Sequence, residues 1–287
     1  MNYKKEKYLS IICFAFLFIN YCSFSQEVNN NFNLGITSFN KKNYKEALTY
    51  FNEANRLKDT SKALYYNRAL VKKNLNLFAE AIYDFNKYII LDSSNADAYY
   101  YRAFSKDEIN NYYGAIIDYN KVLMMNDTFS EAYFNRAITF IRIQEYKMAI
   151  RDLLIVTKLR PLDYEAYYYL GNTYFDLLDY KNAIIYYNKS IELKPDNSKA
   201  LYNRANAKMF LTNYNGAIVD YGKSIKYDKY MGRAYYNRGI AHYYINDVAN
   251  SRIDWYKAGE AGYTDAYKLI NKYAKKGFAR IFQNLTE

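Results

Sequence analysis

The chain has 287 residues, of which 51% are hydrophobic and 24% charged, so it can bury a large core and disorder over most of its length is excluded. Only 2 Pro and 10 Gly interrupt it, which excludes collagen-like and proline-rich classes and allows many helices with short connections. Its formal net charge of +11 favours anionic partners such as acidic peptides, anionic polymers or membrane head groups.

The first predicted element is a leader over residues 1–25. Three lysines precede an apolar core over residues 9–19, and Ser25 closes the segment before Gln26. This order is typical of a signal peptide cleaved after Ser25, so we expect an exported protein, periplasmic or secreted. The apolar core is too short to span a bilayer in the mature protein, and an uncleaved anchor is the alternative. A bulky Tyr directly precedes Cys22, where a lipoprotein signal has a small residue, so lipidation is not expected.

The cysteines and the histidine limit the chemistry of the mature chain. Cys13 and Cys22 both lie in the leader, and His242 is the one histidine of the sequence. The mature chain therefore has no disulfide, no cysteine nucleophile and no Cys/His metal cluster, and a Ser-His-Asp triad would depend on that one histidine. Because the sequence also has no Gly-rich phosphate loop, no paired-carboxylate site and no metal motif, we expect no enzyme activity, no metal and no cofactor.

From residue 28 onward, a 34-residue period repeats seven times without a gap. A small residue recurs at one position of each repeat and again 12 residues later, as expected where two helices approach closely. The first of these positions holds Gly35, Ala69, Ala103, Ala137, Gly171, Ala205 and Gly239. Large residues that the small ones accommodate are Phe51, Phe85, Tyr119, Leu153, Tyr187, Tyr221 and Trp255.

Each repeat predicts a helix, a tight turn and a second helix. Over residues 165–194 the apolar side chains follow helical spacing, stop at Leu178-Asp179-Tyr180 and then resume. Pro161 and Pro195 lie in links between repeats, where a helix must stop. Because no single pair of helices buries both of its faces, we expect the repeats to stack into a solenoid with a shared core.

The repeats resemble the tetratricopeptide repeat family. The fifth repeat matches the family pattern best, through Tyr167, Leu170, Gly171, Tyr174, Ala183, Tyr187 and Pro195, with Ser190 in place of the third small residue. The resemblance implies an all-α fold, a right-handed α-solenoid of seven helix-turn-helix repeats. The expected repeats within 26–265 are 28–61, 62–95, 96–129, 130–163, 164–197, 198–231 and 232–265.

Residues 266–287 are expected to form a capping helix and a basic tail. Leu269 and Ile270 contribute to an apolar face that would cover the open end of the stack. Four cations lie outside this face, Lys272, Lys275, Lys276 and Arg280. They form either a solvated end cap or an attachment to an anionic polymer or leaflet of the cell envelope.

Five repeats have Arg where the family usually has Leu, and the same five have Asp 16 residues later. The pairs are Arg68 with Asp84, Arg102 with Asp118, Arg136 with Asp152, Arg204 with Asp220 and Arg238 with Asp254. The other two repeats have Leu34 with Tyr50 and Leu170 with Tyr186. This concordance, together with the bidentate fit of Arg to a carboxylate, predicts structural ion pairs between helices, chance concordance being the alternative.

The resemblance implies that the first helix of each repeat lines the inner surface and contacts the ligand. Three residues before the small residue, an aromatic ladder runs along these helices, with asparagines beside it. Later repeats add apolar side chains, including Phe175, Met209, Phe210 and Tyr244. The predicted peptide-binding residues are Phe134, Asn135, Tyr168, Asn172, Tyr202, Asn203, Arg233, Tyr236 and Asn237. The alternative is that Tyr and Asn are common family choices at these positions.

Family members that clamp the terminal carboxylate of a peptide use cations and asparagines from three successive repeats. Asn172, Asn203 and Arg233 match that set, whereas Tyr168 and Asn237 replace two of its cations. We expect an exported, non-enzymatic scaffold that binds a protein or peptide, acidic or ending in a carboxylate. Contact with a membrane or envelope polymer is the alternative, and because of export no nucleic acid is expected.

Overall fold

The computed structural model describes residues 26–57, 60–229 and 231–272. The expected leader and the cations Lys275, Lys276 and Arg280 lie outside these residues. The chain divides into two compact units, which we call the N-terminal unit, residues 1–139, and the C-terminal unit, residues 140–287.

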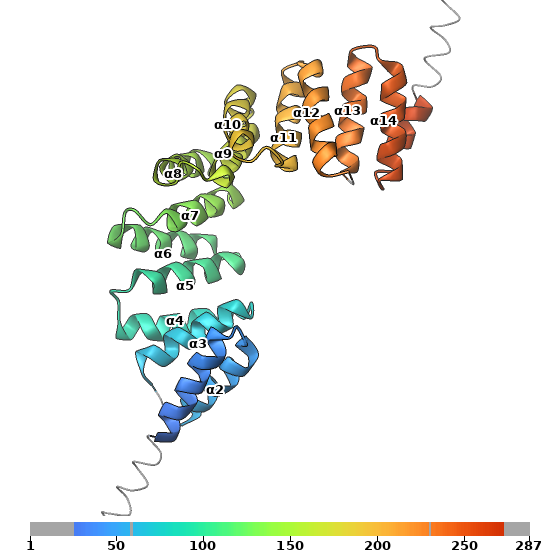
Figure 1. The fold of residues 1–287 in the computed structure, drawn as a ribbon. Coiled ribbons are helices and arrows are strands. Elements are labelled where there is room, and N and C mark those ends of the chain that lie inside the picture. The colour runs from blue at the N-terminus through green and yellow to red at the C-terminus, as the bar shows by residue number, and fades with distance from the viewer. Residues whose placement is uncertain (1–25, 58–59, 230, 273–287) are drawn as a thin grey trace, which may run out of the picture. The chain divides into compact units, whose positions relative to one another are not determined.

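In its described residues, the N-terminal unit consists of helices and short turns (Figure 1). A helix over residues 26–40 comes first. It is followed by α2 (Tyr44–Arg56), α3 (Lys62–Asn74), α4 (Phe78–Leu91), α5 (Ala96–Glu108) and α6 (Tyr112–Met125), and α7 (Ser130–Arg142) begins in this unit. Consecutive helices pack against each other from α2 through α6, as expected of stacked helix pairs.

The C-terminal unit repeats this arrangement. Its helices are α8 (Tyr146–Leu159), α9 (Tyr164–Asp176), α10 (Tyr180–Leu193), α11 (Ser198–Phe210), α12 (Tyr214–Tyr227), α13 (Gly232–Tyr244) and α14 (Val248–Glu260), followed by a described helical stretch over residues 266–272. Each of α8 to α13 packs against the helix that follows it. The predicted all-α solenoid class is thereby confirmed. Among the described helices, none has the length and apolar character needed to cross a bilayer.

The same tight turn ends the first helix of every repeat. The second residue after that helix has a φ between 57° and 63° in all seven repeats, at Lys42, Asn76, Asn110, Gln144, Leu178, Thr212 and Asn246. This left-handed conformation is unfavourable for a side chain other than Asn or Asp, so hydrogen bonds must hold it. In the second repeat, the N–H of Leu77 donates to the carbonyl of Lys72 at 2.8 Å and closes the turn.

The small and large residues of the period meet inside each helix pair. The seven predicted large side chains are at most 1% exposed. A Cβ on Gly171 would lie 2.5 Å from Cδ1 of Tyr187, and one on Gly239 would lie 2.6 Å from Nε1 of Trp255. The helices therefore approach as closely as the small residues predicted.

Candidate functional site

Charged side chains join the two helices within a repeat. Nε and Nη2 of Arg68 donate to the two carboxylate oxygens of Asp84 at 2.8 and 2.6 Å, and both side chains are buried. The same bidentate geometry recurs in three further expected pairs, Arg102 with Asp118, Arg204 with Asp220, and Arg238 with Asp254. Arg136 and Asp152 belong to different compact units, so their pairing stays a prediction.

A second cation, which sequence analysis missed, shares three of these carboxylates. It is a lysine four residues after the arginine, and its Nζ lies 2.6 to 2.8 Å from the carboxylate in Lys72–Asp84, Lys106–Asp118 and Lys208–Asp220. In the seventh repeat, His242 occupies this position, with Nε2 3.8 Å from Asp254 and Nδ1 3.0 Å from Asp247. In the sequence, the recurrence of Lys four residues after the arginine in three repeats could have indicated this second cation.

The fifth repeat fills the same space without charge. Tyr174 occupies the position of the lysine, and its ring stacks on Tyr186 with centroids 5.2 Å apart and planes 6° apart. Leu170 and Tyr186 therefore replace Arg and Asp as parts of a three-residue set. Because these sets fill the space between paired helices, they belong to the scaffold.

The rings of the aromatic ladder form a wall of the core. Tyr168 lies 6.3 Å from Tyr187, centroid to centroid, and Tyr202 lies 5.7 Å from Tyr221. Burial raises the pKa of Tyr187 and of Tyr221, so both hydroxyls keep their protons and can donate hydrogen bonds. The ladder tyrosines are half-buried, and each can present only part of its ring to a ligand.

Two asparagines, one from each of the first helices of two successive repeats, form a hydrogen-bonded amide pair. Nδ2 of Asn237 in α13 donates to Oδ1 of Asn206 in α11 at 3.0 Å and to the Tyr202 hydroxyl at 3.0 Å. The Tyr221 hydroxyl also donates to Oδ1 of Asn206, at 2.6 Å. Asn206 is a site residue that sequence analysis missed, although it occupies the position of Asn172 one repeat later.

The same amide pair occurs one repeat earlier. Nδ2 of Asn203 donates to Oδ1 of Asn172 at 2.8 Å and to the Tyr168 hydroxyl at 3.3 Å. The Tyr187 hydroxyl donates to Oδ1 of Asn172 at 2.9 Å. The predicted ligand contacts Asn203 and Asn237 thus use their N–H groups within the protein.

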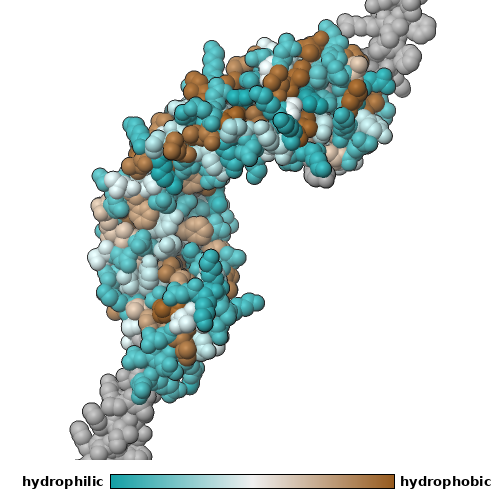
Figure 2. Space-filling model, viewed as in Figure 1, coloured by the Kyte–Doolittle hydropathy of each residue, from teal (hydrophilic) through white to brown (hydrophobic). Residues whose placement is uncertain are grey.

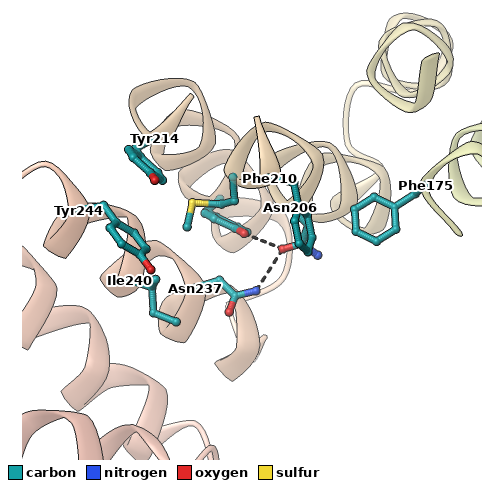
Figure 3. Close-up of a pocket in the computed structure, with 9 residues that line it drawn as sticks. Phe175, Asn206, Phe210, Tyr214, Asn237, Ile240 and Tyr244 are labelled. Carbon is teal, nitrogen blue, oxygen red and sulfur yellow. Dashed lines mark hydrogen bonds between the residues drawn. The ribbon is translucent and has the colours of Figure 1, made fainter. Parts of the chain in front are cut away.

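These bonds decide which amide atoms a ligand can reach. Oδ1 of Asn206 accepts two internal hydrogen bonds, whereas its Nδ2 points to the side of Phe175 (Figure 3). Nδ2 of Asn237 is turned toward Asn206, and its Oδ1 points away. Each pair therefore offers one amide donor group and one amide acceptor.

A cavity of about 500 Å³ opens beside the second amide pair. Its lining consists of Phe175, Asn206, Met209, Phe210, Tyr214, Tyr221, Asn237, Ile240 and Tyr244, none of them charged. Tyr214 stacks on Tyr244 with centroids 4.8 Å apart, and Phe210 stacks on Tyr180 at 4.5 Å. Phe210 and Tyr244 nevertheless remain 60% and 57% exposed. This composition suits an apolar, uncharged group.

The other predicted site residues lie elsewhere. Arg233 is exposed at the start of α13, eleven residues before Tyr244, which corresponds to about 16 Å along a helix. Tyr236 packs against Tyr263, with centroids 4.8 Å apart. Phe134 and Asn135 belong to the N-terminal unit, where Nδ2 of Asn135 donates to the Tyr100 hydroxyl at 2.8 Å.

Hydrophobic side chains gather in clusters over the C-terminal unit, with hydrophilic ones between them (Figure 2).

Across the described residues, no group of three or more His, Cys, Asp or Glu side chains is placed to hold a metal ion.

Comparison with known proteins identifies the repeat. Residues 28–60 and 164–197 match the family described as tetratricopeptide repeat. No curated protein matches the chain. A solved structure, the C-terminal part of a TPR repeat-containing protein from Cytophaga hutchinsonii, is similar with a TM-score of 0.69 and 22% identity, over 79% of this chain and 93% of that one.

Two further solved structures have a similar fold. A tetratricopeptide repeat protein from Parabacteroides merdae has a TM-score of 0.62 and 19% identity, over 86% of this chain and 98% of that one. YrrB, described as a TPR protein with an unusual peptide-binding site, has a TM-score of 0.55 and 20% identity, over 62% of this chain and 91% of that one.

Proposed function

Since the chain is a tetratricopeptide repeat protein, we propose that it is a non-catalytic scaffold that binds an extended segment of a partner protein on the inner helices of its C-terminal unit. Proteins of this fold typically mediate protein–protein interaction. YrrB, whose structure is similar, is described as having an unusual peptide-binding site. The observation that carries the proposal is the pair of amide groups beside the apolar cavity.

The two amide pairs match the backbone of an extended peptide. Nδ2 of Asn206 would donate to a peptide carbonyl, and Oδ1 of Asn237 would accept from a peptide N–H. Asn172 and Asn203 offer the same two groups one repeat earlier. Because internal hydrogen bonds hold these amides, little conformational entropy is lost when a peptide binds.

The cavity selects the side chain of the segment. Phe210 and Tyr244 offer exposed aromatic area at low rotamer cost, so an aromatic or aliphatic side chain would enter between them. An acidic side chain or a terminal carboxylate would be met by Arg233 at the other end of α13. The bound segment therefore has an apolar side chain at the cavity, and any acidic group of the segment lies near Arg233.

The experiment begins with a displayed library of random peptides selected on the full chain. The affinity of the selected peptides is then measured by calorimetry for the wild type and for the double variant Phe210→Ala with Tyr244→Ala. We expect the double variant to bind at least about 30-fold more weakly, since truncating aromatic anchors of an interface costs about 2 kcal/mol or more. Both side chains are exposed, so the helix content should not change.

Two further variants separate the groove from general surface hydrophobicity. Leu162→Ala removes a side chain that is 79% exposed in the link between α8 and α9, and it should leave the affinity unchanged. Asn206→Asp keeps the internal acceptor but replaces the outward N–H donors with a carboxylate oxygen, and it should weaken binding about tenfold or more. Unchanged affinity in both groove variants, or equal losses in the groove and Leu162 variants, would overturn the proposal.

A further inference from the structure

Charge is divided unequally between the two sets of helices in the C-terminal unit. The first helices of the repeats, α9, α11 and α13, which we call the inner helices, have balanced exposed charges, Glu165, Asp176, Lys199 and Arg233. The other set, α8, α10, α12 and α14, presents eight exposed cations, Lys147, Arg151, Lys158, Lys181, Lys223, Lys226, Arg252 and Lys257, and the partly exposed Lys189. Its exposed acidic side chains are Glu192 and Glu260.

The acidic residues inside this second set do not offset the cations. Asp220 and Asp254 are 1% and 2% exposed, and each is bonded to the arginine of its own repeat. Of the two exposed acids, Glu192 pairs with Lys189 at 2.9 Å and so offsets that one cation, which leaves eight cations against Glu260. We call the solvent-facing side of α8, α10, α12 and α14 the outer face. It is strongly basic, while the groove helices are balanced.

Apolar side chains form a row within the outer face. Ile185, Val219 and Ile253 recur at the 34-residue period and are 58%, 55% and 51% exposed. Four residues further along each helix, one turn away on the same side, stand Lys189, Lys223 and Lys257. An aliphatic side chain and a lysine are thus presented together once on each of α10, α12 and α14.

We propose that the outer face of the C-terminal unit docks on an anionic lipid leaflet. The cations would meet lipid phosphates, and the aliphatic row would enter the boundary between head groups and acyl chains. A soluble acidic polymer would account for the lysines but not for the repeated aliphatic row beside them. An acidic protein would need a complementary groove for each of several separated helices, whereas a leaflet is laterally continuous and adapts to them.

This surface is separate from the proposed peptide groove. Most cavity residues lie on α9, α11 and α13, and α12 contributes Tyr214 and the buried Tyr221. The outer-face side chains of α12, Val219 and Lys223, are exposed and do not line the cavity. Lipid binding and peptide binding would therefore be independent, and the scaffold would hold its partner segment at a membrane surface. The inference does not rest on the C-terminal cations of residues 275–280.

The test measures cosedimentation of the full chain with vesicles of phosphatidylglycerol and phosphatidylcholine in equal parts, against vesicles of phosphatidylcholine alone. The variant Lys189→Gln, Lys223→Gln, Lys257→Gln should bind the anionic vesicles about 100-fold more weakly at low salt, the loss expected for three lysines near an anionic surface. A leader that is still present contributes alike to the wild type and to every variant, so the difference between the wild type and the lysine variant on anionic vesicles reports the outer face.

A matched control changes the net charge equally on the N-terminal unit. Lys41→Gln, Lys42→Asn and Lys45→Gln neutralise three exposed lysines, and Asn tolerates the left-handed conformation at position 42. This control should bind the anionic vesicles like the wild type.

A second variant distinguishes lipid from polymer. Ile185→Ser, Val219→Ser, Ile253→Ser keeps every charge, and it should weaken vesicle binding by about tenfold or more while leaving binding to soluble polyglutamate unchanged.

Three results would overturn the proposal. The first is an equal loss of vesicle binding in the lysine variant and in its N-terminal control, and the second is unchanged vesicle binding in the lysine variant. The third is a serine variant that binds vesicles like the wild type. A serine variant that binds vesicles like the wild type, together with a lysine variant that loses polyglutamate binding, would assign the face to an acidic polymer. Circular dichroism of each variant confirms its fold.

Discussion

Asp220 illustrates how one buried carboxylate organises a repeat. It is 1% exposed, accepts two hydrogen bonds from Arg204 and lies 2.6 Å from Nζ of Lys208. Arg204 also donates through Nη1 to Asn188 of the preceding repeat at 2.8 Å. A single set of side chains therefore joins the two helices of one repeat and connects that repeat to the one before it.

Removing this carboxylate should be more harmful than replacing the whole set. Asp220→Ala leaves two largely buried cations without their anion, and we expect the free energy of unfolding to fall by about 3 to 5 kcal/mol. The triple variant Arg204→Leu, Lys208→Tyr, Asp220→Tyr copies the uncharged set of the fifth repeat. It should be more stable than Asp220→Ala in urea denaturation monitored by circular dichroism. A triple variant that is as unstable as the single one would show that the sets are not interchangeable.

At the scale of the helix pair, packing depends on a small residue facing a large ring. Gly239 lies against Trp255, which is 1% exposed and whose Nε1 donates to the carbonyl of Tyr236 at 3.2 Å. This bond holds the indole in place, so the ring cannot easily yield to an added methyl group. The sixth repeat has Ala205 opposite Tyr221, whereas the first and fifth repeats have Gly opposite Phe51 and Tyr187.

A methyl group added at Gly239 in the seventh repeat should therefore be destabilising, although the sixth repeat has a methyl group at the same position in Ala205. Gly239→Ala should lower the free energy of unfolding by about 1 to 3 kcal/mol despite the higher helix propensity of Ala, because the core becomes overpacked. The matched change Ala205→Gly should cost about 1 kcal/mol through propensity and lost contacts. Thermal unfolding of both variants measures the difference. A stabilised Gly239→Ala variant would contradict the packing account.

At the scale of the whole molecule, the two proposed binding surfaces differ in charge. Binding to the inner helices and binding to the outer face of the C-terminal unit should therefore depend differently on salt. The groove is uncharged at its cavity, whereas the outer face is basic. Electrostatic contacts on an exposed surface are screened as ionic strength rises, while burial of apolar area is not. Salt thus separates the two proposed interactions within one protein.

We expect the dissociation constant of a selected groove peptide to change less than about threefold between low and high salt, because its contacts are apolar and amide in character. Isothermal calorimetry at two ionic strengths measures this directly. A steep loss of affinity with salt would place the peptide on charged surface instead of in the cavity.

The fate of the leader is also a property of the whole chain. The order of lysines, apolar core and small residues predicts cleavage after Ser25, with Gln26 as the mature amino terminus. Intact mass spectrometry of the protein from its native host checks this. A mass that retains residues 1–25, or one that carries lipid on Cys22, would contradict it.

Much of the scaffold was readable from the sequence because a repeat presents each structural position seven times. The period located the paired helices, and the small and large residues located their contacts, since both depend on local spacing. The joint exchange of Arg with Asp for Leu with Tyr predicted ion pairs, four of which the structure describes.

The binding surface depended on contacts that sequence spacing does not specify. Only the folded chain shows that Asn206 and Asn237 bond each other across 31 residues, because the direction of an amide is set by the neighbours it meets in space. The same holds for the cavity between Phe210 and Tyr244, which successive repeats create together. Local sequence thus determined the helices and their pairing, whereas the tertiary structure decided which donors, acceptors and rings remain for a partner.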